Sequence, residues 1–182
     1  MAMERSFPII QVVGFQNSGK TTLMERLIHV ATEKGMQVAS FKHHGHGGIP
    51  DQTLKRKDSE KHQQAGAFVS GVEGSGLLSI QSKRKQWKLE EIITLYSFFQ
   101  PDVLFIEGYK QASFPKIVII RDKNDWLSLC SLSNILCVIS SVHLKSNVQS
   151  VPVFLTGEYE QCIDFVLSYI FSNAKDHFHD LP

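Results

Sequence analysis

The sequence predicts an α/β fold in which a mostly parallel β-sheet is covered on both faces by helices. Short, continuously apolar strands alternate with amphipathic helices along the chain, and a glycine-bearing turn joins the first strand to the first helix. Continuous apolar runs are typical of strands buried on both faces, as parallel strands are. A turn-separated pair of strands in the middle of the chain indicates some antiparallel pairing as well.

Length and composition indicate an ordinary globular protein. The 182 residues suit one domain, predicted over residues 1–172, with residues 173–182 as a flexible tail. The net charge of +1 provides no global basic field, so we expect no nucleic-acid partner. No apolar run approaches the roughly 20 residues that span a bilayer, so no membrane segment is expected. The first motif lies too near the amino terminus for a cleaved signal peptide, which predicts a cytoplasmic protein.

The cysteines support the same location. Cys130, Cys137 and Cys162 are odd in number, scattered, and set in apolar surroundings. This pattern predicts buried, reduced thiols of a cytosolic protein rather than a disulfide framework.

The first elements form a predicted β-α-β unit. Residues 9–13 are an apolar, β-branched run that ends in Gly14, residues 22–34 carry two apolar rows of a helix, and residues 38–41 are a second strand. Gly35 is predicted to end the helix. A unit of this kind, about 30 residues long, is a common supersecondary motif.

Polar loops and further strands follow. A long polar loop covers residues 42–57 and a short helix residues 58–65. The sequence "EGSG" separates two strands predicted over residues 67–72 and 76–81. The remaining predicted elements are a helix around Leu89, Ile92, Ile93 and Tyr96, strands over residues 103–106, 117–120, 135–139 and 153–155, and a final helix carrying Cys162, Phe165, Val166, Tyr169 and Ile170.

The segment "GFQNSGKT" predicts a phosphate site. It matches the pattern G-x-x-x-x-G-K-[ST] at Gly14, Gly19, Lys20 and Thr21, between a buried strand and a helix. Glycines there let backbone N–H groups turn toward one centre, and the start of the helix adds its positive end. We therefore predict a P-loop NTPase-like three-layer α/β/α fold. Lys20 would bridge the β- and γ-phosphates, Thr21 would bind Mg²⁺, and Thr22 would contact the α-phosphate.

A P-loop site of this kind also needs an acid near the metal. Glu107 follows the apolar strand over residues 103–106, which brings its carboxylate to the carboxyl edge of the sheet, where the phosphates are expected. Asp102 begins the same strand and so lies at the wrong end. Asp58 is a second candidate metal ligand, although an aspartate before Ser59 and Glu60 is also typical of a helix cap.

Histidines follow the second strand closely, and three interpretations stay open. His43, His44 and His46 would bind zinc if His62 or a cysteine completed the site, but their spacing is not that of a standard structural zinc site. The same histidines would form a surface for an anionic substrate. The cations that would join them there are Lys42, Lys55, Arg56 and Lys57. The third interpretation is a solvated basic loop.

Several segments in series resemble the molybdopterin-guanine dinucleotide biosynthesis protein B (MobB) family. The resemblance covers residues 8–172, nearly the whole chain. The segments that carry it are "GFQNSGKTTLMERLI", "FKHHGHGG", "KDSEKHQQAGA", "DVLFIEGYK" and "FPKIVIIRD". The P-loop alone is shared by many families, whereas the later segments in this order are far more specific.

The resemblance implies a GTP-binding protein with weak, Mg²⁺-dependent GTP hydrolysis. Members form dimers and associate with the MobA-type guanylyltransferase that joins GMP to molybdopterin, so GTP, Mg²⁺ and molybdopterin or its guanine dinucleotide are the implied ligands. By position, Asp58 and Glu107 fall on the family's D-S and E-G-[FY]-K segments. The residues implied to bind the cofactor are Gly14, Asn17, Ser18, Gly19, Lys20, Thr21, Thr22, Lys42, His43, His46, Arg121 and Asp122.

Two alternatives and the base preference stay open at this stage. The guanine-reading N-K-x-D sequence is absent, and Ser140 and Ser141 stand where family members often carry Ser-Asp. Guanine and adenine therefore cannot be separated by this motif. A small-molecule kinase and a metal-delivery GTPase are the alternative functions, although no arginine-rich lid and no cysteine pair is present.

Overall fold

The computed structural model describes residues 7–44, 57–144 and 151–173, and side chains of these residues except 57–60. The chain forms two compact units, one of residues 1–46 and 96–182 and one of residues 47–95, each of which is described by itself. That residues 1–172 form a single domain stays a prediction. The predicted tail, apart from Asn173, lies outside the described residues.

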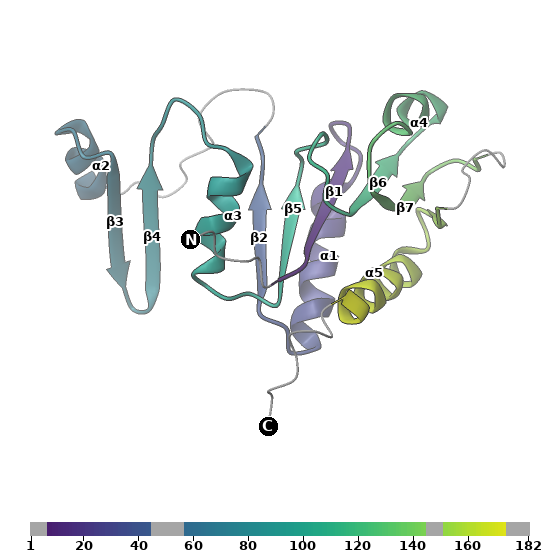
Figure 1. Ribbon diagram of the computed structural model, residues 1–182, viewed down its shortest axis with the longest axis horizontal. Helices are drawn as coiled ribbons and strands as arrows, with labels where there is room; N and C mark the ends of the chain where they lie inside the picture. Colours follow the sequence, from purple (N-terminus) through teal and green to yellow (C-terminus); the bar gives the residue numbers. More distant parts are fainter. Residues whose placement is uncertain (1–6, 45–56, 145–150, 174–182) are drawn as a thin grey trace. The chain divides into compact units, whose positions relative to one another are not determined.

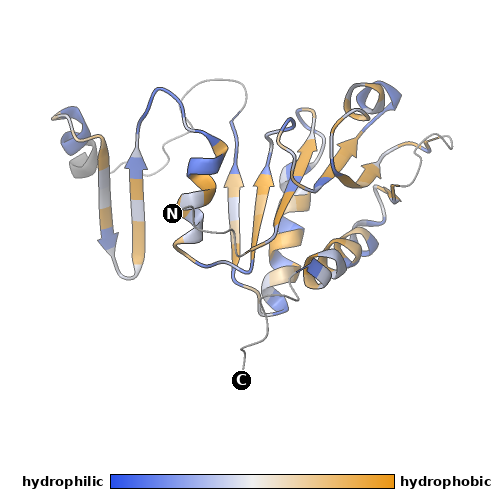
Figure 2. Ribbon diagram, viewed as in Figure 1, coloured by the Kyte–Doolittle hydropathy of each residue, from blue (hydrophilic) through white to orange (hydrophobic). Residues whose placement is uncertain are grey.

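A six-stranded sheet is the centre of the larger unit, and all of its described strand pairs are parallel (Figure 1). The strand order is β2-β5-β1-β6-β7-β8. Their bounds are Ile9–Gly14 (β1), Val38–Lys42 (β2), Val103–Glu107 (β5), Lys116–Ile120 (β6), Ile135–Ser140 (β7) and Val153–Leu155 (β8). The predicted strands of this sheet are confirmed. The inner strands β1, β5 and β6 are buried throughout, as their apolar runs predict, whereas the edge strands β2 and β8 are partly exposed (Figure 2).

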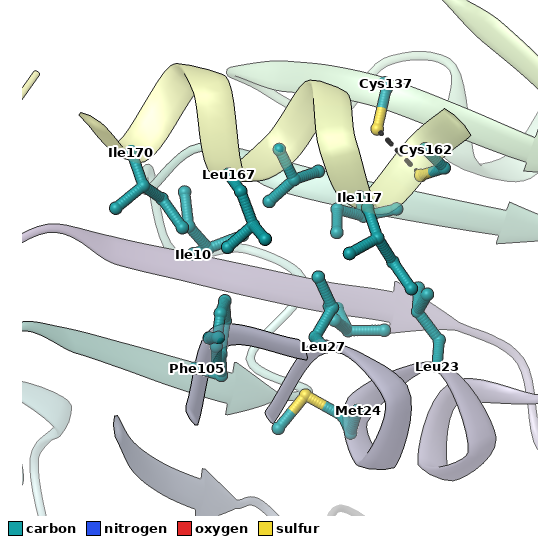
Figure 3. Close-up of a cluster of buried hydrophobic side chains, with 14 of the residues drawn as sticks. Ile10, Leu23, Met24, Leu27, Phe105, Ile117, Cys137, Cys162, Leu167 and Ile170 are labelled. Carbon is teal, nitrogen blue, oxygen red and sulfur yellow. Dashed lines mark hydrogen bonds between the residues drawn. The ribbon is translucent and has the colours of Figure 1, made fainter. Parts of the chain in front are cut away.

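Helices cover both faces of this sheet, which confirms the predicted three-layer α/β/α fold. On one face, α1 (Lys20–Glu33) and α5 (Tyr159–Asn173) pack Leu27 and Leu167 against residues such as Ile10 and Ile117 (Figure 3). On the other face, Leu129 of α4 (Lys123–Leu129) packs with strand residues that include Val13, Val118 and Val138. Successive side chains of each strand point to opposite faces of the sheet, and so toward these two helical layers in turn.

Helix α4 was missed from the sequence. Its seven residues are too few for a helical period to stand out, but Asp122 before it is a strong cap residue. The helix also explains a wrong prediction for Cys130, which caps its carboxyl end and is exposed. Cys137 and Cys162 are buried as predicted, with their sulfur atoms 3.7 Å apart (Figure 3).

The smaller unit contains a β-hairpin with a helix on it. Strands β3 (Val69–Gly74) and β4 (Leu77–Ser82) pair antiparallel, and α2 (Lys57–Gln64) packs on β3. The strands extend further into the predicted "EGSG" turn than expected, because Ser75 and Gly76 both have positive φ and make a two-residue turn. Helix α3 (Leu89–Ser97) crosses the boundary between the units.

Strand register brings the predicted site residues to one edge of the large sheet. Lys42 at the end of β2 pairs with Glu107 at the end of β5, and Glu107 pairs in turn with Val12 of β1. Gly14 ends β1 two residues later. The carboxyl ends of parallel strands meet here, which is where α/β sheets bind ligands. Within the described residues, no helix is both long and apolar enough to span a bilayer.

Candidate functional site

The turn between β1 and α1 forms a cup of backbone. Asn17 and Gly19 have φ values of 58° and 90°, so both residues adopt the left-handed conformation. Gly14 has no room for a side chain, because a Cβ atom there would lie 2.5 Å from Ser18 Oγ and 2.8 Å from Ile119 O. The first intrahelical bond of α1 runs from Leu23 N–H to Gly19 O, and earlier helical amides lack such partners. This geometry suits an anion, as the sequence predicted.

Two side chains of the cup, those of Ser18 and Lys20, carry polar groups that are at least partly buried. Ser18 is 8% exposed, and among the described residues its buried Oγ has no hydrogen-bond partner. Lys20 Nζ donates to Phe15 O at 2.6 Å, so the ammonium rests on the cup itself. Burial lowers the pKa of Lys20, and the negative charge of Glu107 opposes that shift. An orphaned hydroxyl and a desolvated ammonium are both groups that phosphate oxygens would satisfy.

Thr21 and Glu107 come together as the sequence predicted for a metal site. Thr21 Oγ1 donates to Glu107 Oε2 at 3.3 Å, and Glu107 is buried, with 7% of its surface exposed. A hydroxyl oxygen and a carboxylate are the hard ligands that Mg²⁺ prefers, so the residues present fit that ion. Lys42 reaches the same place. Its Nζ lies 3.2 Å from Thr21 Oγ1 and 3.2 Å from Glu107 Oε1.

The segment after β5 makes the opposite wall of the pocket. Gly108 and Tyr109 have φ values of 103° and 51°, and a Cβ atom on Gly108 would lie 3.0 Å from His43 Cβ. The fully buried Gln11 of β1 donates from Nε2 to Gly108 O at 3.0 Å and to Tyr109 O at 2.8 Å. The wall is therefore fixed from inside the sheet.

Lys116 fixes the far end of the same wall. It is fully buried at the start of β6, and its Nζ donates to three carbonyls: Ala112 O at 2.8 Å, Phe114 O at 3.0 Å and Ser133 O at 2.5 Å. Burial lowers the pKa of Lys116. An ammonium has three donors, so this buried group is fully satisfied.

Aromatic rings and cations line the wall. The rings of His43 and Tyr109 stack with centroids 4.0 Å apart, and Phe41 lies against Tyr109 at 6.1 Å. Lys110 Nζ lies 4.0 Å from the centre of the Phe15 ring. These contacts place a polar, partly aromatic surface next to the anion cup.

Arg121 and Asp122 lie beside the cup rather than in its lining. Arg121 donates from Nε to Asp125 Oδ2 at 2.9 Å and from a terminal nitrogen to Gln16 O at 3.3 Å, so it braces the cup from behind. Hydrogen bonds from Arg121 lower the pKa of Asp125. Asp122 Oδ1 accepts from the backbone of Asn124 and Asp125, at 2.8 and 2.9 Å, and caps α4. Direct contact of either residue with the cofactor stays a prediction.

Some predicted site residues are not placed at the pocket. His46 lies outside the described residues, as does the side chain of Asp58, whose backbone belongs to α2 of the smaller unit. Ser140 ends β7, and Ser141 follows the strand with its Oγ 3.0 Å from Thr156 Oγ1. In the described part of the chain, no three His, Cys, Asp or Glu side chains gather closely enough to hold a metal ion.

The pocket made by these groups has a volume of about 770 Å³. Its lining comprises residues 14–22, 42–44 and 107–112. An open parallel sheet with a phosphate-binding turn between its first strand and first helix defines the class of P-loop NTPase-like proteins.

Comparison with known proteins identifies the family. The family model for MobB, molybdopterin guanine dinucleotide synthesis protein B, matches residues 9–141. The probable molybdopterin-guanine dinucleotide biosynthesis adapter protein of Bacillus subtilis strain 168 is 43% identical over 170 residues, which cover 93% of this chain and 97% of the relative. The chain belongs to the MobB family, and the resemblance seen in its motifs is confirmed.

Solved structures agree with this assignment. The crystal structure of Bacillus subtilis MobB is 43% identical and superposes with a TM-score of 0.80 over 90% of this chain and 98% of that one. The hydrogenase maturation factor HypB from Archaeoglobus fulgidus, at 16% identity, gives a TM-score of 0.52 over 92% of each chain. At that identity the likeness shows a shared fold alone.

Sequence reasoning missed the two buried residues that fix the pocket wall. Gln11 and Lys116 are polar residues inside otherwise apolar strands, "IIQVVG" and "KIVII". A polar side chain at a fully buried strand position needs hydrogen-bond partners, so each of these residues indicated a specific hydrogen bond within the fold. Which backbone groups they bind could only be known once the strands were paired.

Proposed function

We propose that this chain is a GTP-binding adapter protein in the biosynthesis of the molybdopterin guanine dinucleotide form of the molybdenum cofactor. The observation that carries the proposal is the phosphate cup at Gly14–Thr22, facing the Thr21–Glu107 pair, in a chain of the MobB family. Relatives named as biosynthesis adapters support the pathway, and a cytoplasmic place of action is part of the proposal. In this proposal the chain binds and presents the nucleotide rather than turning it over quickly.

The roles of the site residues follow from their positions. The amides of the cup and the orphaned Ser18 hydroxyl would bind phosphate oxygens, and Lys20 would leave Phe15 O for the β- and γ-phosphates. Thr21 and Glu107 would hold Mg²⁺, which supplies positive charge to the phosphates when bound. The stacked wall of His43 and Tyr109 would face the other part of a bound ligand, with molybdopterin as the proposed second ligand.

We further propose that any GTP hydrolysis is weak. Fast P-loop hydrolases supply an arginine or a positioned water to the transition state. Among the described residues that line the pocket there is no arginine, and Arg121 is already bound to Asp125. The preference for guanine over adenine is part of the proposal and rests on the family alone.

A homodimer and a MobA-type guanylyltransferase are the proposed protein partners. The hairpin of the smaller unit supports the dimer, because the face that it turns away from Ser70 and Gln81 presents exposed apolar side chains. These are Val69, Leu78 and Ile80, which are 41%, 53% and 59% exposed. Exposed apolar side chains on one face of a hairpin are typical of an interaction site.

Reconstitution of guanine dinucleotide synthesis tests this function. Purified guanylyltransferase, molybdopterin, Mg²⁺ and GTP are assayed without this protein, with it, and with its Lys20→Ala variant. The proposal predicts that the intact protein raises the rate or lowers the GTP concentration needed, and that Lys20→Ala does neither. No effect of the intact protein would refute the adapter role. Multiple-turnover transfer of phosphate to a small acceptor would instead support the kinase alternative.

A further inference from the structure

We propose that Lys42 occupies the metal position when no nucleotide is bound, and that Mg²⁺ enters only when phosphates draw Lys42 away. The inference rests on the proposed function, because it concerns the same pocket. It assigns to Lys42 the control of when the metal binds.

The position of the ammonium carries this inference. Lys42 Nζ lies 3.2 Å from Thr21 Oγ1 and 3.2 Å from Glu107 Oε1, the two residues that would hold the metal. Those two residues contact each other at 3.3 Å, through Thr21 Oγ1 and Glu107 Oε2. The ammonium therefore bridges the hydroxyl and the carboxylate, as a bound cation would.

The strands fix this arrangement. Lys42 and Glu107 are partners in the parallel pairing of β2 and β5, at the last residue of each strand. His43 N–H donates to Glu107 O at 2.9 Å, which continues the pairing one residue further. The side chain of Glu107 is only 9% exposed, so its charge needs a nearby cation, and Lys42 supplies one.

A magnesium ion and this ammonium cannot share the place. Mg²⁺ binds oxygen ligands at about 2.1 Å, and two cations held against one carboxylate repel each other strongly. Mg²⁺ alone must therefore break the Lys42–Glu107 ion pair. The side chain of Lys42 is 58% exposed, so it can leave without disturbing β2.

A nucleotide changes this balance. Lys42 lines the same pocket as the phosphate cup, and Glu107 is the one acidic residue among the described residues of that lining, so phosphates would give a displaced ammonium a new anionic partner. Metal and nucleotide are then expected to bind together, each strengthening the other, which is a reciprocal coupling. Lys42 would keep the site closed to free Mg²⁺.

The test compares metal binding with and without nucleotide. Mn²⁺ serves as the probe in place of Mg²⁺, and its free concentration is measured by electron paramagnetic resonance. Wild type is compared with Lys42→Met, which removes the charge, and with Lys42→Gln as a second variant in case the first does not fold. Lys34→Met, at the exposed end of α1, is the charge-matched control.

Removing the charge at Lys42 should tighten Mn²⁺ binding without nucleotide by about tenfold or more, because a competing cation is lost. Adding Glu107→Gln to Lys42→Met should abolish that gain. Lys34→Met should behave as wild type. With GTP present, wild type should bind Mn²⁺ much more tightly than without it, and the Lys42 variants should show a smaller difference.

Equal Mn²⁺ affinity of wild type and both Lys42 variants without nucleotide would overturn the inference, as would a gain that survives Glu107→Gln. Failure of the proposed function has a different signature. In that case wild type would bind no GTP with any metal, while the nucleotide-free comparison would still decide the position of Lys42.

Discussion

Gly14 shows most directly how one residue shapes the backbone cup between β1 and α1. A side chain there would clash with Ser18 Oγ and with the backbone carbonyl of Ile119, and the carbonyl cannot move without disturbing β6. Only a hydrogen in that place allows the chain to turn so closely over the strand. The local backbone geometry therefore requires glycine at this position whether or not a ligand is bound.

Gly14→Ala should therefore destabilise the fold by about 1 to 3 kcal/mol, the usual range for overpacking, and weaken nucleotide binding. Chemical denaturation and calorimetric titration measure the two effects. Gly157→Ala is the matched control, because a Cβ atom there meets nothing within 4 Å. Equal stability of the two variants would contradict this role of Gly14.

Asp125 offers a prediction that depends on pH. Its pKa lies below the ordinary value of 3.8, chiefly because Arg121 donates hydrogen bonds to it. The folded state therefore holds the charged carboxylate more favourably than the unfolded state does. That stabilisation is present above about pH 4 and is lost as the pH falls through the lower folded value.

Asp125→Asn should lower the melting temperature at neutral pH, with the difference from wild type shrinking below pH 4. Differential scanning calorimetry across this range measures it. A difference that stays constant down to pH 2 would show that the charge of Asp125 is not what stabilises the pair.

The loop after β5 illustrates how elements place the site. Its backbone carbonyls are held at one end by Gln11 and at the other by Lys116, both fully buried in neighbouring strands. Because β1 and β6 are themselves fixed in the sheet, these hydrogen bonds also hold the backbone of the pocket wall in place. Rigid elements of this kind position binding groups more accurately than a free loop can.

Lys116→Met should leave buried carbonyls without a donor and cost about 2 to 4 kcal/mol of stability. Hydrogen exchange should become faster in residues 109–114, and nucleotide binding should weaken with it. The exposed Lys123→Met is the control. Unchanged exchange in this segment would mean that Lys116 does not hold the wall.

The strands and the glycine-bearing turn between β1 and α1 were predictable from the sequence, and the contacts between them were not. Runs such as "VLFIE" predict buried strands, because apolar and β-branched residues suit a sheet that is covered on both faces. Helix α4 was missed because seven residues show no clear period, and its cap, Asp122, was interpreted as a ligand. The contact of Lys42 with Glu107 depends on the strand order β2-β5-β1, which no local pattern reveals.

At the scale of the whole molecule, the proposed nucleotide site and the proposed partner surface lie in different units. The larger unit carries the proposed phosphate cup, and the smaller unit carries a hairpin with exposed apolar side chains on one face. Within the described residues, neither strand of this hairpin pairs with a third strand. Both features favour a protein that acts through partners.

Ile80→Lys should therefore weaken the proposed homodimer without unfolding the chain, because it puts a charge into an apolar contact. Sedimentation velocity over a range of concentrations measures the change, and circular dichroism checks the fold. Thr32→Lys, on the exposed side of α1, is the control. A dimer as stable in Ile80→Lys as in wild type would place the interface elsewhere.

The most direct measurement of the central claim is calorimetric titration of GTP into the purified protein in the presence of Mg²⁺, for wild type and Lys20→Ala. We expect wild type to bind one GTP per chain. Loss of the charge-assisted bonds from Lys20 should weaken that binding by about 10- to 100-fold. Absence of binding in wild type, or equal affinity of the two proteins, would contradict the nucleotide site.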